Sequence, residues 1–339
     1  MSLSVLSRRG FLAAGLGATL LTLAACGGDE HKPAAGSAAS PSAPAAGPWS
    51  FTDDRGKKLD LPKRPERIVA QVGAAAVLWD FGVRPIAVFG PHKLKDGSKD
   101  PQIGAVDLAG VETLGNVWDE FNVEKYISLQ PELLVSGMYN GDTLWYVPEK
   151  STATIEQAAP TLGVKLYGRS IPDLIARYGE VAASLGADLN APAVTEAKAK
   201  FEAASKALVT PEAKQLKVVF MAGGPESLWI ANFKDHIDVG YVKELGLDVV
   251  VPDKVDEAGY WETLSWENAD KYKADVIFVD ARAQSMQVPE MMKKPTFAQL
   301  PAVKAGQVYP WRAEQRYSYQ GYAEMLEELS ANLAKAKKL

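Results

Sequence analysis

Short apolar runs alternate with amphipathic segments along most of the chain. Runs at 67–71, 132–136 and 275–280 predict buried strands, and segments such as 239–245 have the period of a helix. Strands that alternate with helices indicate a mainly parallel sheet covered by helices. Further strands are expected at 85–89, 164–168, 217–221, 228–231, 249–251 and 307–310, further helices at 74–81, 123–129 and 155–159, and a hairpin over 49–61.

Two consecutive helices interrupt this alternation in the middle of the chain. They are predicted at 171–185 and 192–208, and the second has Pro192 in its first turn and ends before Pro211. A helix of that length spans about 25 Å, enough to join two lobes side by side. The predicted fold is therefore α/β, with two Rossmann-like lobes whose sheets are mainly parallel, joined by one long α-helix. The lobes are expected at 49–170 and 211–339, with the helical segment at 171–210, and a last helix at 319–335.

The first 48 residues have a different composition from the rest. Ser7-Arg8-Arg9-Gly10-Phe11-Leu12 leads into an apolar run, which is the order of a twin-arginine export signal, and the run is too short to span a bilayer stably. Leu23-Ala24-Ala25-Cys26 resembles a bacterial lipobox, so residues 1–25 are expected to be removed and Cys26 to be lipidated. The alternative is an ordinary cleaved secretory signal. Residues 26–48 are rich in Ala, Gly, Ser and Pro and predict a flexible tether.

Composition limits the classes of function. The chain has 339 residues and a net charge of −5, and this balance gives no basic excess for binding nucleic acid. One cysteine excludes an internal disulfide, and three histidines are too few for a multi-histidine metal site without carboxylates. Because the single cysteine lies in the lipobox, the protein is expected to be anchored by lipid at the outer face of the cytoplasmic membrane.

A short unit occurs once in each half of the chain. Asn122-Val123-Glu124-Lys125 precedes one predicted strand, and Ser265-Trp266-Glu267-Asn268 precedes another at the same spacing. Asn122 and Ser265 are good N-cap residues, which puts Glu124 and Glu267 in a first helical turn. Such a glutamate can simply favour the helix dipole. Its recurrence also suits docking onto a partner with a pseudo-twofold basic surface.

Aromatic and arginine side chains gather in the loops that follow or precede the predicted strands. In open α/β sheets ligands bind beyond the carboxyl ends of the strands, so these loops are expected to line a cleft. Any one of these aromatic residues could instead cover the core, but three aromatics and two arginines fall within 309–317. The candidate ligand-binding residues are Trp118, Tyr139, Trp145, Arg169, Trp261, Arg282, Trp311, Arg312, Arg316 and Tyr317.

Together with the lipobox and the tether, Pro65-Glu66-Arg67-Ile68-Val69 and the two glutamate units give the mature chain a resemblance to one family. The sequence is similar to the class III substrate-binding lipoproteins of iron-siderophore and cobalamin importers. The resemblance implies two lobes that clamp a ligand, hinge slightly on the single helix, and use Glu124 and Glu267 to engage arginines of a permease dimer. The chain departs from many relatives at Gly73-Ala74-Ala75-Ala76, where they have a polar or acidic residue. Contacts made by that stretch in relatives are therefore not expected here.

The ligand expected on this basis is a ferric siderophore. Its iron is already saturated by the chelator, so no cofactor or metal is expected to be bound directly by the protein. Aromatic candidates outnumber arginines, which favours a neutral or cationic hydroxamate such as a ferrioxamine over strongly anionic complexes. The protein is expected to act as a monomer with an ABC permease dimer, and to bind no nucleic acid.

Other classes of function remain as alternatives. A binding protein for cobalamin or haem would share the fold, and a free-metal binder would have only His92 and His236 outside the tether. An extracellular carboxylate-dependent hydrolase would need two acids in one pocket. Signatures such as Gly-x-Ser-x-Gly, His-Glu-x-x-His and the P-loop are absent from the sequence, so no enzyme activity is expected.

Overall fold

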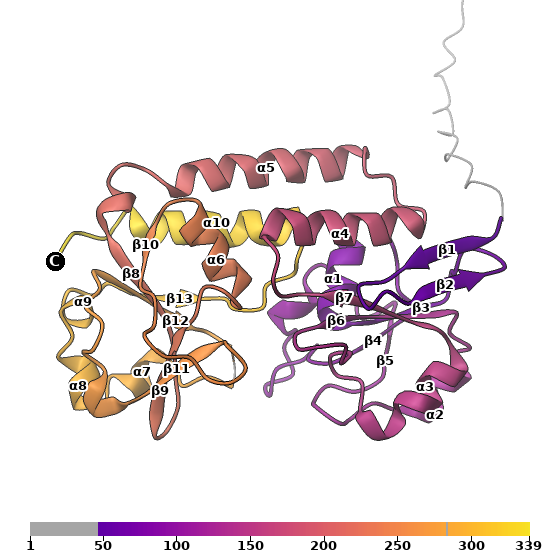
Figure 1. The fold of residues 1–339 in the computed structure, drawn as a ribbon, viewed down its shortest axis with the longest axis horizontal. Coiled ribbons are helices and arrows are strands. Elements are labelled where there is room, and N and C mark those ends of the chain that lie inside the picture. The colour runs from indigo at the N-terminus through magenta and orange to yellow at the C-terminus, as the bar shows by residue number, and fades with distance from the viewer. Residues whose placement is uncertain (1–46, 283) are drawn as a thin grey trace, which may run out of the picture. The chain divides into compact units, whose positions relative to one another are not determined.

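A computed structural model describes residues 47–282 and 284–339. The proposed export signal, Cys26 and nearly all of the tether lie outside the described residues. The architecture confirms the predicted class, with two α/β lobes joined by one long helix (Figure 1).

The N-terminal lobe contains a five-stranded sheet in which all neighbouring strands are parallel. The order is β5-β4-β3-β6-β7, so the chain starts in the middle of the sheet and builds outward to both edges. Three helices connect these strands. The strands are β3 (Ile68–Gln71), β4 (Ala87–Phe89), β5 (Glu112–Thr113), β6 (Leu133–Met138) and β7 (Thr161–Lys165), and the helices are α1 (Val72–Asp80), α2 (Val123–Ser128) and α3 (Thr152–Ala158), with short 3-10 turns η1 (Pro101–Ile103) and η2 (Glu149–Ser151).

The predicted hairpin is formed by β1 (Trp49–Thr52) and β2 (Lys58–Leu61), and its turn contacts the edge strand of the sheet. The Asp53 carboxylate accepts a hydrogen bond from the main-chain N–H of Gly163 at 3.0 Å, and Asp54 accepts one from that of Lys165 at 2.8 Å. These contacts satisfy edge groups of β7 that no neighbouring strand pairs. Strand β7 therefore lies at 161–165 instead of the predicted 164–168. Gly168, the last residue of the predicted strand, has a φ of 66°, so its backbone is not extended.

The C-terminal lobe has a six-stranded sheet in which two strands run antiparallel to their neighbours. The main order is β11-β9-β8-β12-β13, with β10 pairing β8. The strands are β8 (Lys217–Gly223), β9 (Ser227–Ala231), β10 (Asp248–Val249), β11 (Trp261–Ser265), β12 (Val276–Asp280) and β13 (Val308–Trp311), and the helices are α6 (Ile237–Glu244), α7 (Val288–Met291), α8 (Pro295–Ala298) and α9 (Pro301–Lys304), with 3-10 turns η3 (Ala213–Gln215) and η4 (Trp266–Asn268).

Strand β11 has no counterpart among the predicted strands because a charged residue occupies one of its buried positions. Glu262 is 5% exposed, and its carboxylate accepts hydrogen bonds from Lys271 Nζ and the Tyr272 hydroxyl, each at 2.5 Å. Buried Glu262 and Leu264 alternate with more exposed neighbours, as expected of a strand with one buried face. A glutamate at a core position hides this alternation from a hydrophobicity pattern.

The helix that joins the lobes is α5 (Pro192–Leu208), with the predicted bounds. It packs along α10 (Tyr319–Leu333), next to which α4 (Ile171–Ser184) also lies (Figure 1). An ion pair of 3.2 Å between Lys200 and Glu327 links α5 with α10. These helices cover the same side of both sheets.

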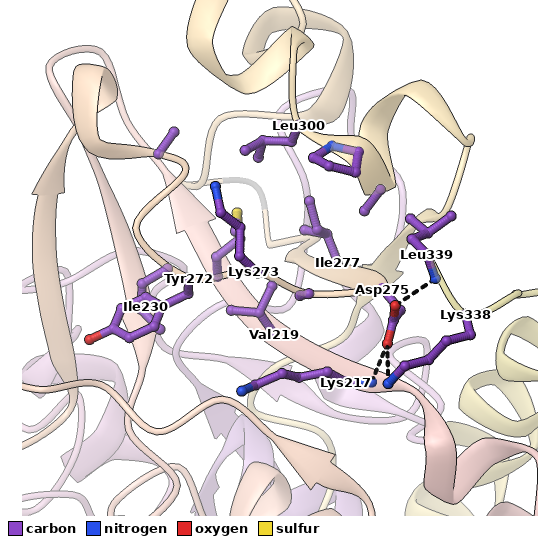
Figure 2. Close-up of a pocket in the computed structure, with 15 residues that line it drawn as sticks. Lys217, Val219, Ile230, Tyr272, Lys273, Asp275, Ile277, Leu300, Lys338 and Leu339 are labelled. Atoms are coloured by element: carbon purple, nitrogen blue, oxygen red, sulfur yellow. Dashed lines mark hydrogen bonds and ion pairs between the residues drawn. The ribbon is translucent and has the colours of Figure 1, made fainter.

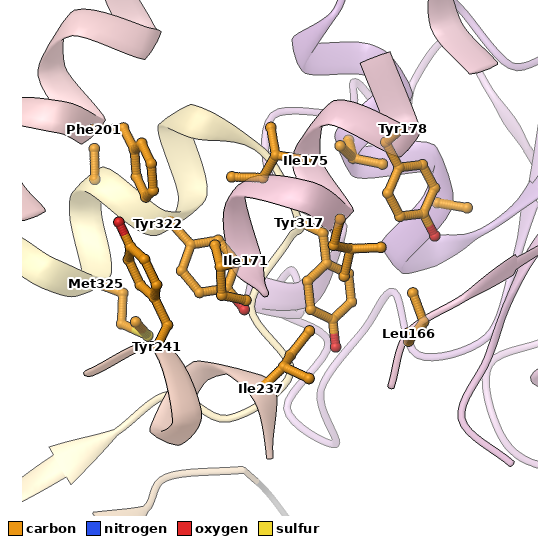
Figure 3. Close-up of a cluster of buried hydrophobic side chains, with 14 of the residues drawn as sticks. Leu166, Ile171, Ile175, Tyr178, Phe201, Ile237, Tyr241, Tyr317, Tyr322 and Met325 are labelled. Carbon is orange, nitrogen blue, oxygen red and sulfur yellow. The ribbon is translucent and has the colours of Figure 1, made fainter. Parts of the chain in front are cut away.

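One apolar core continues from the N-terminal lobe into the C-terminal lobe. It includes side chains from α4, α5, α6 and α10, and Tyr317 from the loop before α10. Tyr178 stacks on Tyr317, and Phe201 stacks on Tyr241 (Figure 3). The opposite face of each sheet has its own smaller core. The shared core lies on the face of both sheets that these helices cover. Separation of the lobes on this face would expose apolar surface to water.

Candidate functional site

Both lobes present the carboxyl ends of their central parallel strands to one region. Tyr139 directly follows β6, and Leu166 directly follows β7, in the N-terminal lobe. Arg282 follows β12 and Tyr317 follows β13 in the C-terminal lobe. Strand order in the first sheet reverses direction between β3 and β6, which is the point where α/β sheets commonly bind ligands.

A cavity of about 190 Å³ lies between these loops. Both lobes contribute to its wall, and six of the lining side chains are Tyr or Trp. The complete lining consists of Tyr139, Trp145, Leu166, Asp235, His236, Ile237, Asp238, Tyr260, Trp261, Arg282, Glu314, Tyr317 and Tyr322. We refer to it as the inter-lobe cavity.

Two tyrosine contacts connect the lobes at this cavity. The hydroxyl of Tyr260 donates a hydrogen bond to the main-chain oxygen of Tyr139 at 2.8 Å. The hydroxyls of Tyr139 and Tyr317 are 3.2 Å apart and share a second hydrogen bond. The lobes are therefore held together across the cavity by polar contacts, in addition to the shared core behind it.

The wall contributed by the N-terminal lobe is a cluster of aromatic rings. Trp145 lies between Tyr139 and Trp118, with ring centroids at 4.8 Å and 4.9 Å, and Tyr146 lies 5.1 Å from Trp118. Trp118 is 48% exposed, an unusual exposure for a ring of this size. Such a partly open cluster offers both ring faces and edges to a bulky apolar ligand.

The wall contributed by the C-terminal lobe is built around His236. Its ring contacts Trp261 at 4.3 Å, Tyr260 at 5.2 Å and Trp311 at 5.4 Å, and its Nε2 is buried without a hydrogen-bond partner among the described residues. Burial, with the nearby positive charge of Arg282, lowers the pKa of His236 to about 3. The imidazole is therefore neutral at physiological pH.

Behind this histidine lies a buried carboxyl group. Trp311 Nε1 donates a hydrogen bond to Asp238 Oδ2 at 2.8 Å. Burial raises the pKa of Asp238 to about 6, although the hydrogen bond from Trp311 acts in the opposite direction. Trp311 itself is 1% exposed, so it supports the wall from beneath.

Arg282 lines the cavity, and its positive charge is already compensated. Its Nε lies 3.0 Å from both carboxylate oxygens of Asp280, and its Nη2 lies 2.8 Å from Asp280 Oδ2. The remaining nitrogen, Nη1, donates to the carboxylate of Glu314. One guanidinium therefore faces two carboxylates, and no free cation remains at this point.

Glu314 occupies a central position in the site. Burial is the main cause that raises the pKa of Tyr139, Tyr146, Tyr260 and Tyr317, and the negative charge of Glu314 adds to it in all four. These tyrosines come from both lobes, so this carboxylate acts on the whole cavity. Its backbone has a φ of 56°, a left-handed conformation that is uncommon for a residue other than glycine and is often found at functional sites.

A second cavity of about 320 Å³ lies on the other side of the Arg282–Glu314 pair. These two residues are the ones that line both cavities. Its wall also includes Leu94, Asp100, Pro101 and Gln102 from the N-terminal lobe and Arg312 from the C-terminal lobe. The ion pair thus forms a partition within a larger space between the lobes.

The structure brings together about half of the predicted ligand-binding residues. Tyr139, Trp145, Trp261, Arg282 and Tyr317 line the inter-lobe cavity, and Trp118 contacts Trp145 at its rim. Arg312 lines the second cavity and pairs with Glu328 at 3.1 Å.

The other predicted residues line neither of these two cavities, and Arg169 instead lines a third cavity of about 530 Å³ together with Phe233, Lys234 and residues of α6. Arg169 pairs with Asp54 at 3.0 Å, and Arg316 pairs with Asp80 at 3.0 Å. Trp311 lies beneath the wall, as described above. Of the residues that the sequence did not single out as ligand contacts, Tyr260, His236, Asp235 and Glu314 line the cavity. Tyr260 adjoins Trp261, and Glu314 lies in the aromatic run 309–317, so their neighbours were the available signals.

The first turn of α1 is occupied by its own cap. Gln71 Oε1 accepts hydrogen bonds from the N–H groups of Gly73 at 2.8 Å and Ala74 at 3.3 Å. These groups would otherwise be open to an anion at the helix N-terminus. The Gly-Ala stretch therefore contributes no free side-chain contact at the cleft.

The two predicted docking glutamates are both exposed, one in each lobe. Glu124 lies in the first turn of α2, where Asn122 Oδ1 caps the N–H of Lys125 at 2.9 Å as expected. Glu267 lies in η4, which is a single 3-10 turn, and Ser265 makes no capping hydrogen bond to it. The predicted second capped α-helix is thus shorter than its counterpart, because buried Trp266 packs inward directly after strand β11.

Within 47–282 and 284–339, no three His, Cys, Asp or Glu side chains come together in a way that could hold a metal ion. Across the same residues, no helix is both long and apolar enough to cross a membrane.

Comparison with known proteins gives consistent matches. Residues 96–315 match the family described as periplasmic binding protein. The chain is 41% identical to DesE, a ferric-siderophore receptor protein from Streptomyces coelicolor, whose crystal structure superposes with a TM-score of 0.80 over 86% of this chain and 100% of that one. It is 23% identical over 263 residues to the Fe(3+)-citrate-binding protein YfmC of Bacillus subtilis, which covers 76% of each chain.

A more distant structure shares the fold. The triscatecholate siderophore binding protein FeuA from Bacillus subtilis, solved with ferri-bacillibactin, is 18% identical. Its TM-score is 0.62 over 84% of this chain and 98% of that one. The family match at residues 96–315 extends over parts of both lobes and includes the lining residues of the inter-lobe cavity except Tyr317 and Tyr322. The chain therefore belongs to the periplasmic binding protein family and is a solute-binding protein rather than an enzyme.

Proposed function

We propose that the protein captures a ferric siderophore between its two lobes and delivers it to the permease of an ABC importer. The observation that carries this proposal is the inter-lobe cavity, whose aromatic wall is contributed by both lobes. The similarity to DesE, described as a ferric-siderophore receptor, supports the same class of ligand. The iron arrives inside the chelate, so the protein supplies contacts to the chelate and no metal ligands.

The proposed ligand contacts come from two groups of residues. Aromatic contacts are made by Tyr139, Trp145 and Trp118 on one side and by Trp261, Tyr260 and Tyr317 on the other. Polar contacts are made by Arg282 and His236, whose Nε2 is buried without a partner in the described structure. Arg312 contacts a ligand large enough to reach the second cavity. Arg169 and Arg316 reach the ligand only if they leave their present carboxylate partners.

The charges around the cavity favour a neutral or cationic chelate, such as a ferric hydroxamate of the ferrioxamine type. Arg282 is the single arginine in the lining, and Asp280 and Glu314 already compensate its charge. Asp235 adds a further carboxyl group. A ferric citrate or ferric catecholate complex is strongly anionic and would meet these carboxylates beside an arginine whose charge they already compensate.

Ligand uptake requires the lobes to move apart from the arrangement described here. The inter-lobe cavity, at about 190 Å³, is smaller than the usual range for small-molecule sites, roughly 300 to 1,000 Å³, and the Arg282–Glu314 pair separates it from the second cavity of about 320 Å³. The tyrosine contacts across the cavity are few and polar, so water can replace them when the lobes separate. We infer that this arrangement is a closed one.

Binding can be tested directly by tryptophan fluorescence. Trp118, Trp145 and Trp261 lie at or near the cavity, so a bound ferric chelate should quench their emission in a saturable way. A panel of ferric hydroxamates, catecholates, citrate, haem and cobalamin would be titrated under identical conditions. Absence of saturable quenching by every ferric siderophore would refute the proposed function, and tighter binding of citrate or catecholate would refute the preference for hydroxamates.

Delivery to a permease is proposed to use one glutamate from each lobe. Glu124 and Glu267 are exposed, and within residues 47–282 and 284–339 neither is engaged in an ion pair. Two free carboxylates on separate lobes can meet two basic sites of a permease dimer at the same time. The protein is proposed to act as a monomer in this complex.

Attachment to the outer face of the cytoplasmic membrane is proposed to depend on Cys26, after export by the twin-arginine route. The lipobox and the adjacent tether support this proposal. A diacylglyceryl group supplies the two chains that stable anchoring requires. The Cys26→Ala variant should appear in the soluble fraction, whereas its retention in the membrane fraction would argue against lipidation.

A further inference from the structure

A separate cavity of about 370 Å³ lies within the C-terminal lobe, on the face of the sheet that carries the smaller core of that lobe. Figure 2 shows its floor, which is formed by alternate residues of neighbouring strands, Val219 from β8, Ile277 from β12 and Ile230 from β9. Each of these side chains is 2% exposed. We refer to this space as the sheet-face cavity.

The roof of this cavity is also apolar. Leu300 lies above the floor (Figure 2), and Pro301, Ala302, Ala269 and Ala274 also line the cavity. Small side chains at these positions leave space that larger ones would fill. An apolar space of this size weakens the core by leaving its lining without contacts, unless another molecule occupies it.

The edge of the cavity has an excess of positive charge. Lys217, Lys273 and Lys338 line it, against one acidic side chain, that of Asp275. Asp275 accepts hydrogen bonds from the main-chain N–H groups of Lys217 at 2.7 Å and Leu339 at 2.8 Å, and lies 3.4 Å from Lys338 Nζ. Its charge is thus compensated by Lys338 and the two N–H groups.

The other two lysines remain available. Lys217 and Lys273 are exposed, and the contact of Lys273 with Asp270, at 3.3 Å, is an exposed surface pair of little strength. Their ammonium groups can therefore turn toward an anion at the mouth of the cavity.

We propose that the sheet-face cavity binds a monoanionic amphiphile of the fatty-acid type, with its alkyl chain on the apolar floor and its carboxylate near Lys217 and Lys273. The apolar lining selects the chain, and the charge at the edge selects an anionic head group over a cationic one. This site is separate from the inter-lobe cavity and shares no lining residue with it. The proposal is therefore independent of what the inter-lobe cavity binds.

The test uses purified protein and straight-chain carboxylates from hexanoate to dodecanoate, each below its micelle concentration, with binding followed by calorimetry. Affinity should rise about fourfold for each added methylene until the cavity is filled, and then level off. Decyltrimethylammonium, which has the same chain and a positive head group, should bind at least tenfold more weakly than decanoate. A lack of saturable binding by all carboxylates, or equal binding of the two head groups, would overturn the proposal.

Two variants connect binding to this cavity. The double variant Lys217→Glu with Lys273→Glu changes exposed residues only and should weaken decanoate binding at least tenfold. The matched control, Lys198→Glu with Lys206→Glu, changes two exposed lysines of α5 and should leave it unchanged. Ala302→Leu should fill the cavity and abolish binding, and the lysine variant keeps the test decisive if that protein does not fold. Unchanged binding in the lysine variant would refute the site.

Ferric-siderophore binding is measured on the same proteins by tryptophan quenching. It should be the same in every variant, because none of the changed residues lines the inter-lobe cavity. Failure of siderophore binding in the unchanged protein would refute the proposed function and leave the sheet-face proposal standing. Failure of decanoate binding alone would refute the sheet-face proposal and leave the proposed function standing.

Discussion

The hydroxyl of Tyr260, in the C-terminal lobe, donates a hydrogen bond to the main-chain oxygen of Tyr139, in the N-terminal lobe, at 2.8 Å. Tyr139 also shares a hydrogen bond with Tyr317 at 3.2 Å. Because α5 and the shared core join the lobes on the other side, these contacts lie where separation of the lobes would open the cavity. A bound ligand must either leave these two hydrogen bonds intact or replace them with its own contacts.

The Tyr260→Phe variant should therefore release its ligand faster. It keeps the aromatic wall and removes one hydrogen bond, worth about 1 kcal/mol, so the dissociation rate should rise about fivefold. The measurement is stopped-flow fluorescence with the preferred ferric chelate. The control is Tyr167→Phe, whose hydroxyl contacts the main-chain oxygen of Gly141 at 3.4 Å within the N-terminal lobe. Equal dissociation rates for both variants and the unchanged protein would show that Tyr260 does not hold the lobes closed over the ligand.

Removing the charge of Glu314 should change ligand preference. With Glu314→Gln, Arg282 keeps Asp280 as its partner but loses the second carboxylate that compensates it. Its positive charge, which faces the cavity, is then less compensated. Binding of ferric citrate relative to a ferric hydroxamate should improve at least tenfold, because a unit charge about 4 Å away contributes about 4 kcal/mol at an effective dielectric constant near 20, whereas a tenfold change needs only about 1.4 kcal/mol. Both dissociation constants are measured by tryptophan quenching.

A remote arginine–glutamate pair serves as the control for this substitution. Glu180 pairs with Arg177 at 2.6 Å in the N-terminal lobe, away from the cavity, so Glu180→Gln should leave the ratio unchanged. If Glu314→Gln also leaves the ratio unchanged, the carboxylate does not select the charge of the ligand.

The overall fold could be predicted from the sequence because its strands and helices are patterned by burial. The joining helix has the predicted bounds, since Pro192 marks its start and apolar residues follow at helical spacing up to Leu208. Strand β11 could not be predicted, because Glu262 occupies a buried position. Its carboxylate is compensated by Lys271 and Tyr272, which lie outside the strand. A pattern of hydrophobicity does not contain information about such partners.

The candidate site could be predicted less completely, because residue type does not reveal the partner of a charged side chain. Arg282 and Arg316 have the same side chain, yet Arg282 lines the inter-lobe cavity while Arg316 pairs with Asp80 from the other lobe. Trp261 and Trp311 likewise differ only in depth, since Trp311 is buried against Asp238. Which side chain faces the cavity depends on contacts between residues far apart in the sequence.

The buried carboxyl group of Asp238 should make stability depend on pH. Its pKa in the folded protein is raised to about 6, above the unfolded value near 3.9, so the folded state binds more protons than the unfolded state between these values. Stability from this group is therefore present at low pH and is lost as pH rises toward 6. In Asp238→Asn the loss is absent, while the amide oxygen can still accept the hydrogen bond from Trp311.

The unfolding free energy of Asp238→Asn minus that of the unchanged protein should therefore rise from pH 4 to pH 6 and stay constant at higher pH. Its total change should be on the order of 2 to 3 kcal/mol. Urea unfolding at pH 4, 5, 6 and 7.5 measures it, and Asp270→Asn, at an exposed position, is the control. A difference that does not vary with pH would mean that Asp238 is not a buried acid of raised pKa.

Replacing both proposed docking glutamates should separate binding from transport. In Glu124→Ala with Glu267→Ala, neither residue lines the inter-lobe cavity, so the affinity for the ferric chelate should be unchanged. Uptake of the iron-labelled chelate by cells should fall at least tenfold, because the two exposed charges proposed to contact the permease are lost. Glu196→Ala with Glu202→Ala removes the same charge from the exposed side of α5 and should leave uptake unchanged. Normal uptake by the Glu124 and Glu267 variant would exclude a docking role for this pair, and equal loss in both variants would indicate a general effect of net charge.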